Sequence, residues 1–127
     1  MEVFTIISTN KNVKKLFFDF LQSNNTLVRS GKDIDKIYYQ YKFDHRCRLY
    51  FYYEYLDFND ELRYNYDEAD RKKIKNAFNT TELYAFDISY NCELIEGILE
   101  GFREYLKKKN IDFEILISHP FKGVISF

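Results

Sequence analysis

The sequence predicts an α+β protein: one domain, residues 1–127, with a mostly antiparallel sheet and about three helices packed mainly on one face. Stretches with alternating apolar residues, typical of strands, are interspersed with stretches whose apolar residues recur every three or four positions, typical of helices. A length of 127 residues suits a single domain, and no linker, repeat or low-complexity tract divides it. The net charge of -1 and the 46% hydrophobic content indicate an ordered chain.

The first half begins with a strand and a helix and continues with strands. VFTIIS, residues 3–8, predicts the first strand, and residues 10–25 predict a helix with an apolar stripe. The runs IDKIYYQYKF (34–43) and RLYFYYEYLDF (48–58) alternate like strands and predict a hairpin around the turn DHR. After the turn FNDE, the alternation in ELRYNY (61–66) predicts a third antiparallel strand.

The second half predicts two helices and three strands. Asp67 is the expected N-cap of a helix over residues 68–78, which has acid in its first turn and base later. A strand follows at 82–90, and Asn91 caps a helix whose apolar side runs from Leu94 to Leu106. Gly101 lies on that stripe and predicts a close approach of helix and sheet. Two final strands, in IDFEILIS and GVISF, flank the turn HPFKG, so the predicted order is β-α-β-β-β-α-β-α-β-β.

No signature of catalysis or of cofactor binding occurs in the chain. The four glycines are not clustered, which excludes P-loops and dinucleotide fingerprints, and no G-x-S-x-G elbow is present. The acidic run lacks the central glycine of a calcium loop, and no H-E-x-x-H motif occurs. Cys47 and Cys92 are expected to be free thiols. We therefore expect a protein that is not an enzyme and holds neither metal nor cofactor.

One catalytic alternative remains open at the level of sequence. His45 and His119, each in a predicted turn, could act as base and acid in metal-independent cleavage of RNA, with Lys122 on the phosphate. This chemistry requires that the fold bring the two imidazoles together. If they do not meet, both are ordinary loop residues.

The most unusual stretch is residues 54–70, EYLDFNDELRYNYDEAD, here called the acidic aromatic segment. Carboxylates gather there around a single Arg63 and alternate with aromatic rings. A sustained negative patch repels itself within a Debye length of about 8 Å, and a cationic partner relieves that repulsion. The candidate partner-binding residues are Glu54, Tyr55, Asp57, Phe58, Asp60, Glu61, Tyr64, Tyr66, Asp67, Glu68 and Asp70.

Such a segment suits a basic cleft on another protein. Acidic side chains steer association with a nuclease or another phosphate-handling protein and could occupy the place of the nucleic-acid backbone. The rings would supply anchors, since buried aromatic residues carry much of the energy of an interface. Direct binding of nucleic acid is not expected, because the aromatic region is acidic and the basic runs RKKIK and REYLKKK lie on solvated helix faces.

Residues 84–127, YAFDISYNCELIEGILEGFREYLKKKNIDFEILISHPFKGVISF, resemble the final section of small bacterial immunity proteins that accompany secreted or contact-delivered polymorphic toxins. The resemblance covers the last third of the chain: a strand ending in SYN, the helix ELIEGILEGFREYL and the closing strands of ILISHPFKGVISF. It implies a non-catalytic protein that binds and neutralises one cognate toxin domain, frequently a nuclease, as in contact-dependent growth inhibition. It carries over no functional residue.

The sequence therefore predicts a toxin-neutralising immunity protein whose acidic aromatic segment covers the basic active site of its toxin. We expect it to be cytoplasmic, because no secretory signal precedes EVFTIIS and every apolar run is too short to cross a membrane. Two alternatives stay open: the ribonuclease using His45 and His119, and a phage-encoded inhibitor of a host nuclease. The oligomeric state is not predicted.

Overall fold

The computed structural model describes residues 2–23, 28–33, 36–41, 44–55, 58–78, 82–90, 95–111, 115–119 and 122–127. Of residues 28–33, 36–41, 44–48, 50–54 and 95, it describes the backbone alone. The elements in chain order are β1 (Glu2–Ser8), α1 (Val13–Ser23), β2 (Val28–Asp33), β3 (Lys36–Tyr41), β4 (Asp44–Glu54), α2 (Phe58–Asn65), α3 (Glu68–Ala77), β5 (Tyr84–Tyr90), α4 (Ile95–Lys108), β6 (Ile115–His119) and β7 (Gly123–Ser126).

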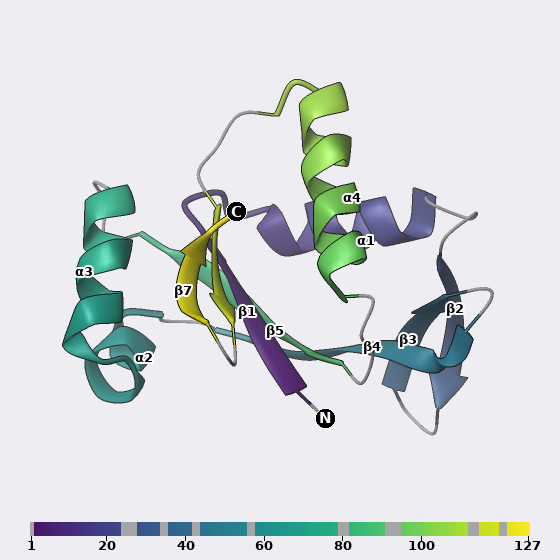
Figure 1. Cartoon of the computed structure of the whole chain (residues 1–127), viewed down its shortest axis with the longest axis horizontal. Coiled ribbons are helices and arrows are strands. Elements are labelled where there is room, and N and C mark those ends of the chain that lie inside the picture. The colour runs from purple at the N-terminus through teal and green to yellow at the C-terminus, as the bar shows by residue number, and fades with distance from the viewer. Residues whose placement is uncertain are drawn as a thin grey trace.

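The described strands form one twisted seven-stranded sheet in the order β2-β3-β4-β5-β1-β6-β7 (Figure 1). Every ladder between neighbours is antiparallel, which confirms the predicted α+β class and antiparallel sheet. β1 and β5 lie near the centre, with Ile6 opposite Phe86. β2 and β3 lie at one end of the molecule, and α2 and α3 lie at the opposite end.

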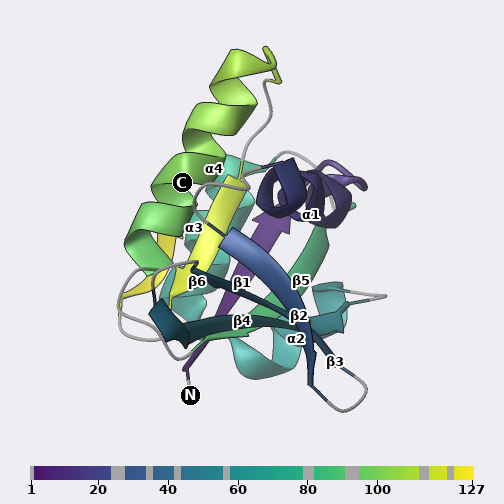
Figure 2. The same cartoon turned by 90° about the vertical axis from the view of Figure 1, so that its right-hand side faces the viewer.

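One face of the sheet is covered by α1 and α4, which lie on the same side of the strands in Figure 2. Rings fill the space between these helices: Phe17 contacts Phe102 edge-on, with ring centroids 4.9 Å apart, and Phe20 lies 5.6 Å from Phe102. Beneath them are alternate residues of the central strands, Phe4, Ile6, Phe86, Ile88, Ile115 and Ile117, all buried. This face contains the larger core.

The opposite face carries α2 and α3 over a smaller core. Phe58, Leu62 and Ile74 pack there against Ile7 and Leu116, which are the strand positions next to those facing the larger core. The alternation of side chains along a strand therefore gives each central strand two buried faces. The described helices divide over both faces, two on each, and do not gather mainly on one face as the sequence predicted.

The predicted strand over 61–66 is wrong, because residues 58–65 form the helix α2. A strand would place Leu62, Tyr64 and Tyr66 on one face, but Leu62 is 8% exposed and Tyr64 is 74% exposed. The spacing of Phe58, Leu62 and Tyr66 is four residues, which matches one side of a helix equally well. A run this short fits both periods, and packing on the sheet selects the helical one.

Three further features differ from the sequence prediction. β2 was not predicted, because its sequence VRSGKD is polar and does not alternate. The residues DHR, predicted as a turn, form the start of β4. Gly101 does mark a close approach, but toward another helix: a Cβ on Gly101 would lie 3.1 Å from Cζ of Phe20 in α1.

Candidate partner-binding surface

The acidic aromatic segment runs from the last residue of β4 through α2 into the first turn of α3. Asp57 lies outside the described residues, and of Glu54 only the backbone is described. The predicted partner-binding residues thus lie on consecutive elements at one end of the sheet, but their side chains differ in exposure and in role.

Three of the four aromatic side chains of the segment pack inward. Phe58 is 1% exposed, and its ring lies edge-on between those of Tyr55 and Tyr66, with centroids 5.5 and 5.7 Å away. Both tyrosines are half-buried against the smaller core. These rings hold α2 on the sheet, so the prediction that they anchor a partner does not fit their burial.

Beneath α2 lies a polar network that the sequence did not predict. Asp87 on β5, 8% exposed, accepts hydrogen bonds from Thr5 Oγ1 at 2.7 Å and from the Tyr55 hydroxyl at 2.8 Å. Burial and the bond to Asp87 raise the pKa of Tyr55 above its ordinary value. Burial also raises the pKa of Tyr66, although hydrogen bonds to Ser118 and Thr5 oppose the rise. The network fixes α2 relative to β1 and β5.

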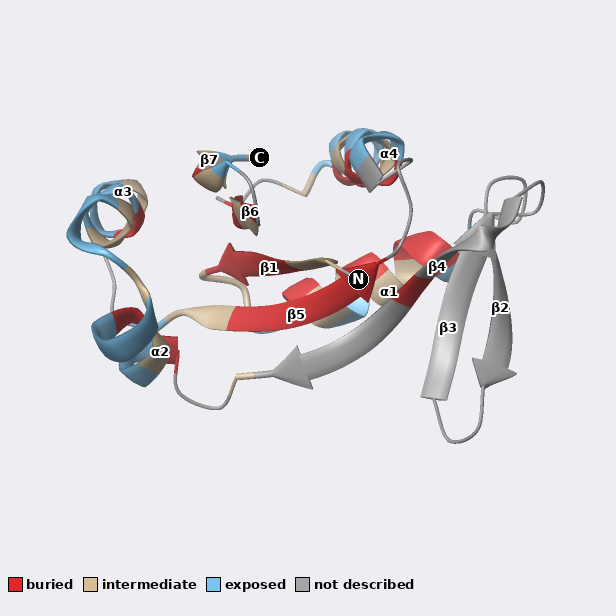
Figure 3. Ribbon diagram, turned by 60° about the horizontal axis from the view of Figure 1, so that its bottom comes forward, coloured by how far each residue is buried: buried red, intermediate tan, exposed pale blue. Residues whose placement is uncertain are grey.

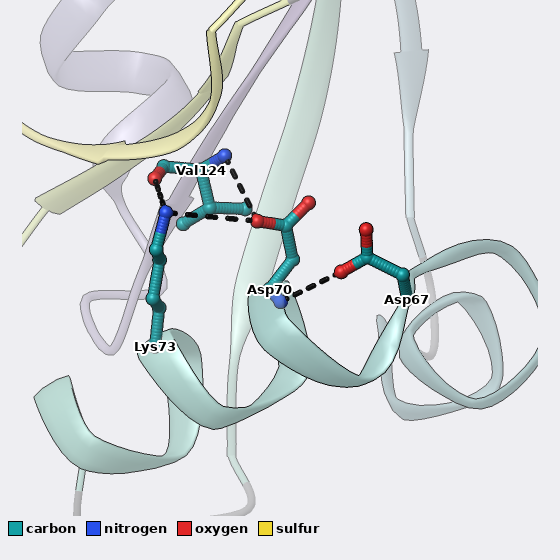
Figure 4. Close-up of polar contacts among 4 residues, drawn as sticks. All are labelled: Asp67, Asp70, Lys73 and Val124. Carbon is teal, nitrogen blue, oxygen red and sulfur yellow. Dashed lines mark hydrogen bonds and ion pairs between the residues drawn. The ribbon is translucent and has the colours of Figure 1, made fainter.

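Two of the carboxylates serve the fold at the junction of α2 and α3. Asp67 caps α3, as predicted, and accepts a bond from the Asp70 amide at 2.8 Å. Asp70 accepts a bond from the Val124 amide on β7 at 3.3 Å, and Lys73 Nζ lies 4.0 Å from Asp70 and donates to the Val124 carbonyl at 3.2 Å (Figure 4). Both carboxylates are therefore already bonded to backbone groups of this chain.

The other described carboxylates of the segment do not hold α3 in place. Glu68 is exposed and forms an ion pair with Lys72 at 3.7 Å, which is worth little at the surface. Glu61 is half-buried and accepts a hydrogen bond from the side-chain Nδ2 of Asn65 at 2.9 Å. Asp60 is exposed on the first turn of α2. An acidic surface remains on α2, smaller than the sequence predicted.

Tyr64 projects from this surface and is the most exposed large hydrophobic residue that the structure describes, at 74%. The guanidinium of Arg63 lies 6.0 Å from the centroid of its ring, at the outer limit of a cation–π contact. Asp60 and Glu61 precede Tyr64 by four and three positions, so they share its side of the helix. Asp60, Glu61, Arg63 and Tyr64 are called the α2 surface below.

The charge around the α2 surface is more balanced than the segment alone suggests. Residues 58–78 contain five acidic and five basic residues, because the later turns of α3 are basic. The acids are Asp60, Glu61, Asp67, Glu68 and Asp70, and the bases are Arg63, Arg71, Lys72, Lys73 and Lys75. Residues 58–78 together are therefore neutral, with the negative charge on α2, at the N-cap Asp67 and at the start of α3.

The two histidines of the catalytic alternative are not brought together. His45 lies in β4 and His119 ends β6, so neither is in a turn, and β5 and β1 separate their strands. Three strand spacings amount to about 14 Å across the sheet. His119 is 8% exposed, with Nε2 3.3 Å from Glu96 Oε1, and Lys122 Nζ lies 3.7 Å from the same oxygen. The strand positions of the two residues therefore give the predicted site for RNA cleavage no support.

Other expectations concern metals, thiols and membranes. Among the residues that the structure describes, no three His, Cys, Asp or Glu side chains are grouped so as to hold a metal ion. Cys92 lies outside those residues and only the backbone of Cys47 is described, so their state stays a prediction. In the same described part of the chain, no helix has the length and apolar character needed to span a membrane.

Comparison with known proteins adds no relative. No protein-family model matches the chain, and searches of curated proteins and of solved structures find no match.

Proposed function

We propose that the protein is a bacterial immunity protein that binds and neutralises a cognate toxin, a nuclease in our reading, without performing chemistry itself. The observation that carries this proposal is the α2 surface, where an exposed tyrosine stands among two carboxylates and an arginine. Tyrosine and arginine are enriched among the residues that dominate binding energy at protein interfaces. The resemblance of the last third of the chain to immunity proteins agrees with this reading.

The physical role of each group follows from its exposure. Tyr64 would insert into the toxin, because its ring can be buried on binding without loss of any contact with the core. Asp60 and Glu61 would steer α2 toward a basic cleft and increase the rate of association. Phe58 and the Asp87 network keep α2 rigid, which lowers the entropy that is lost on binding.

In this proposal the toxin's basic cleft is covered by the α2 surface and not by the whole acidic aromatic segment. Asp67 and Asp70 are used in capping α3 and in binding β7, and α3 contributes compensating positive charge. Inhibition would therefore depend on one helix that blocks the cleft. A phage-encoded inhibitor of a host nuclease could use the same surface and would differ in its neighbouring genes.

The test measures how tightly the protein binds the toxin domain encoded by the neighbouring gene, and whether it protects cells against that toxin. We expect Tyr64→Ala to weaken the complex at least about tenfold, which is the effect of losing roughly 1.4 kcal/mol at an interface. Asp60→Lys should mainly lower the association rate and reduce its dependence on salt. Titration calorimetry and stopped-flow binding measure these effects, and survival of cells that express the toxin reports protection.

Two control variants separate binding from folding and from total charge. Tyr64→Phe keeps the ring and should bind nearly as well as the unmodified protein. Glu104→Lys makes the same charge change as Asp60→Lys on α4, which lies on the other face of the sheet, and should leave association unchanged. Undiminished protection by Tyr64→Ala together with Asp60→Lys would remove the α2 surface from the mechanism.

A further inference from the structure

The two edge strands of the sheet have different surroundings. At β7, the N–H and C=O groups of Val124 that point away from β6 are bound by Asp70 and Lys73 of α3. At the other edge, β3 is the only described strand that pairs with β2, whereas the central strand β5 pairs on both sides and is buried along nearly all of its length (Figure 3). An uncovered edge presents a row of backbone donors and acceptors that a further strand can pair with.

We propose that β2 pairs antiparallel with β2 of a second copy of the chain, so that the sheet continues across a two-fold axis. Asp33 pairs with Lys36, and only two residues separate them. A pair that closes so short a hairpin exchanges both backbone hydrogen bonds, and bonded and non-bonded pairs then alternate along the ladder. The residues of β2 whose N–H and C=O groups point outward are therefore Val28, Ser30 and Lys32.

The sequence of β2, VRSGKD, selects one register for such pairing. With Gly31 on the two-fold axis, Ser30 of each copy is hydrogen-bonded to Lys32 of the other, which gives four backbone bonds. Arg29 is then placed opposite Asp33 of the second copy, twice, at non-hydrogen-bonded positions where residues approach most closely. Gly31 meets Gly31 at the axis, where the absence of side chains permits close approach.

Two neighbouring registers also pair the outward-pointing residues of one β2 with those of the other, but they are less favourable. With Ser30 on the axis, no opposite charges are paired, and with Lys32 on the axis the two lysines oppose each other. Lys36 is already the ladder partner of Asp33 within the hairpin, so the new charge pairs contribute mainly to the choice of register. Because the charges of β2 are complementary to those of a second β2 in the antiparallel direction, a second copy of the chain fits this edge.

A dimer of this kind leaves the α2 surface accessible, because α2 lies at the opposite end of the molecule from β2 (Figure 1). The shared strand pair is short, and an interface of this size belongs to the weak class. Association should therefore depend on concentration. It would also place two α2 surfaces at the two ends of one continuous sheet.

Sedimentation velocity of the purified chain, from about 1 μM to about 1 mM, tests the proposal over the range of weak association. The weight-average mass should rise from 15.5 kDa toward twice that value. Ser30→Pro removes an outward N–H without removing a bond of the β2–β3 hairpin, and should lower the association constant at least about tenfold. Ser30→Ala, its matched control, should associate like the unmodified chain.

Charge exchange tests the register independently of proline. Arg29→Asp alone, and Asp33→Arg alone, each convert two attractive pairs into two repulsive ones and should weaken association by about tenfold. The double variant restores opposite charges at both positions and should recover dimerisation. This series stays informative even where Ser30→Pro disturbs the hairpin.

Three results would overturn the proposal. The first is a chain that stays at 15.5 kDa up to the highest concentration. The second is a dimer that neither Ser30→Pro nor the single charge reversals weaken. In the third, the Ser30 and Lys32 amides are protected from hydrogen exchange only after a different protein is added. That result would mean that a strand of the other protein, and not a second copy, pairs with β2.

Discussion

The assignment of residues 58–65 to a helix predicts opposite consequences for two neighbouring side chains. Leu62 is 8% exposed in the smaller core, and Tyr64 is 74% exposed. Truncating a buried leucine to alanine costs about 2–5 kcal/mol, and a site at the margin of the core lies in the lower part of that range. We therefore expect Leu62→Ala to lower the free energy of unfolding by about 2–3 kcal/mol and Tyr64→Ala by less than about 0.5 kcal/mol.

Urea and thermal unfolding measure this difference. For a chain of 127 residues, a loss of about 2–3 kcal/mol lowers the melting temperature by about 7–11 °C, from the average unfolding entropy per residue. Tyr64→Ala should melt within about 2 °C of the unmodified chain. Similar losses for both variants would refute the helix, because a strand over 61–66 would bury Leu62 and Tyr64 on one face.

Three further perturbations follow from single contacts. Gly123 has φ +68°, and a Cβ at this position would lie 3.3 Å from Asp70 Oδ1. Gly123→Ala should therefore lower the free energy of unfolding in urea by about 1–2 kcal/mol. Equal stability of the two proteins would contradict the left-handed backbone at this residue. Asp67→Ala removes the N-cap of α3 and should cost about 1 kcal/mol, while Asp67→Ser should retain most of it; two variants of equal stability would show that the cap is not used. Burial raises the pKa of Tyr66 above its ordinary 10.0, so the unfolded chain loses this proton first and stability should fall as pH rises past about 10. Tyr66→Phe should reduce the loss of stability per pH unit by at most about 1.4 kcal/mol. Unfolding midpoints measured from about pH 9 to 11.5 test this, and an unchanged slope would contradict the raised pKa of Tyr66.

Long elements with a strong period were predictable from sequence. The stripes of α1 and α4, and the alternation of large apolar residues along β5, repeat often enough that one period fits each of them. The N-cap at Asp67 was also predictable, since a carboxylate before an acidic first turn is a local signal. β2 carries no such signal, because its sequence VRSGKD is polar and does not alternate.

The candidate site was predictable only in part. A concentration of acids and rings pointed to residues 54–70, and α2 lies within that range. Which members face solvent depended on where the helix packs: Phe58 turned inward and Tyr64 outward. Asp87, which accepts hydrogen bonds from both Tyr55 and Thr5, is separated from Thr5 by 82 residues, and the two meet only because β1 and β5 are neighbours in the sheet.

By itself the sequence determined the α+β class, the two amphipathic helices of the larger core and the charge content of the acidic aromatic segment, because each depends on local period and composition. Tertiary structure decided the helical state of residues 58–65, the division of helices over both faces and the separation of the two histidines. These depend on contacts between residues far apart in the chain. A pattern short enough to fit a helix and a strand alike is resolved only by the surface against which it packs.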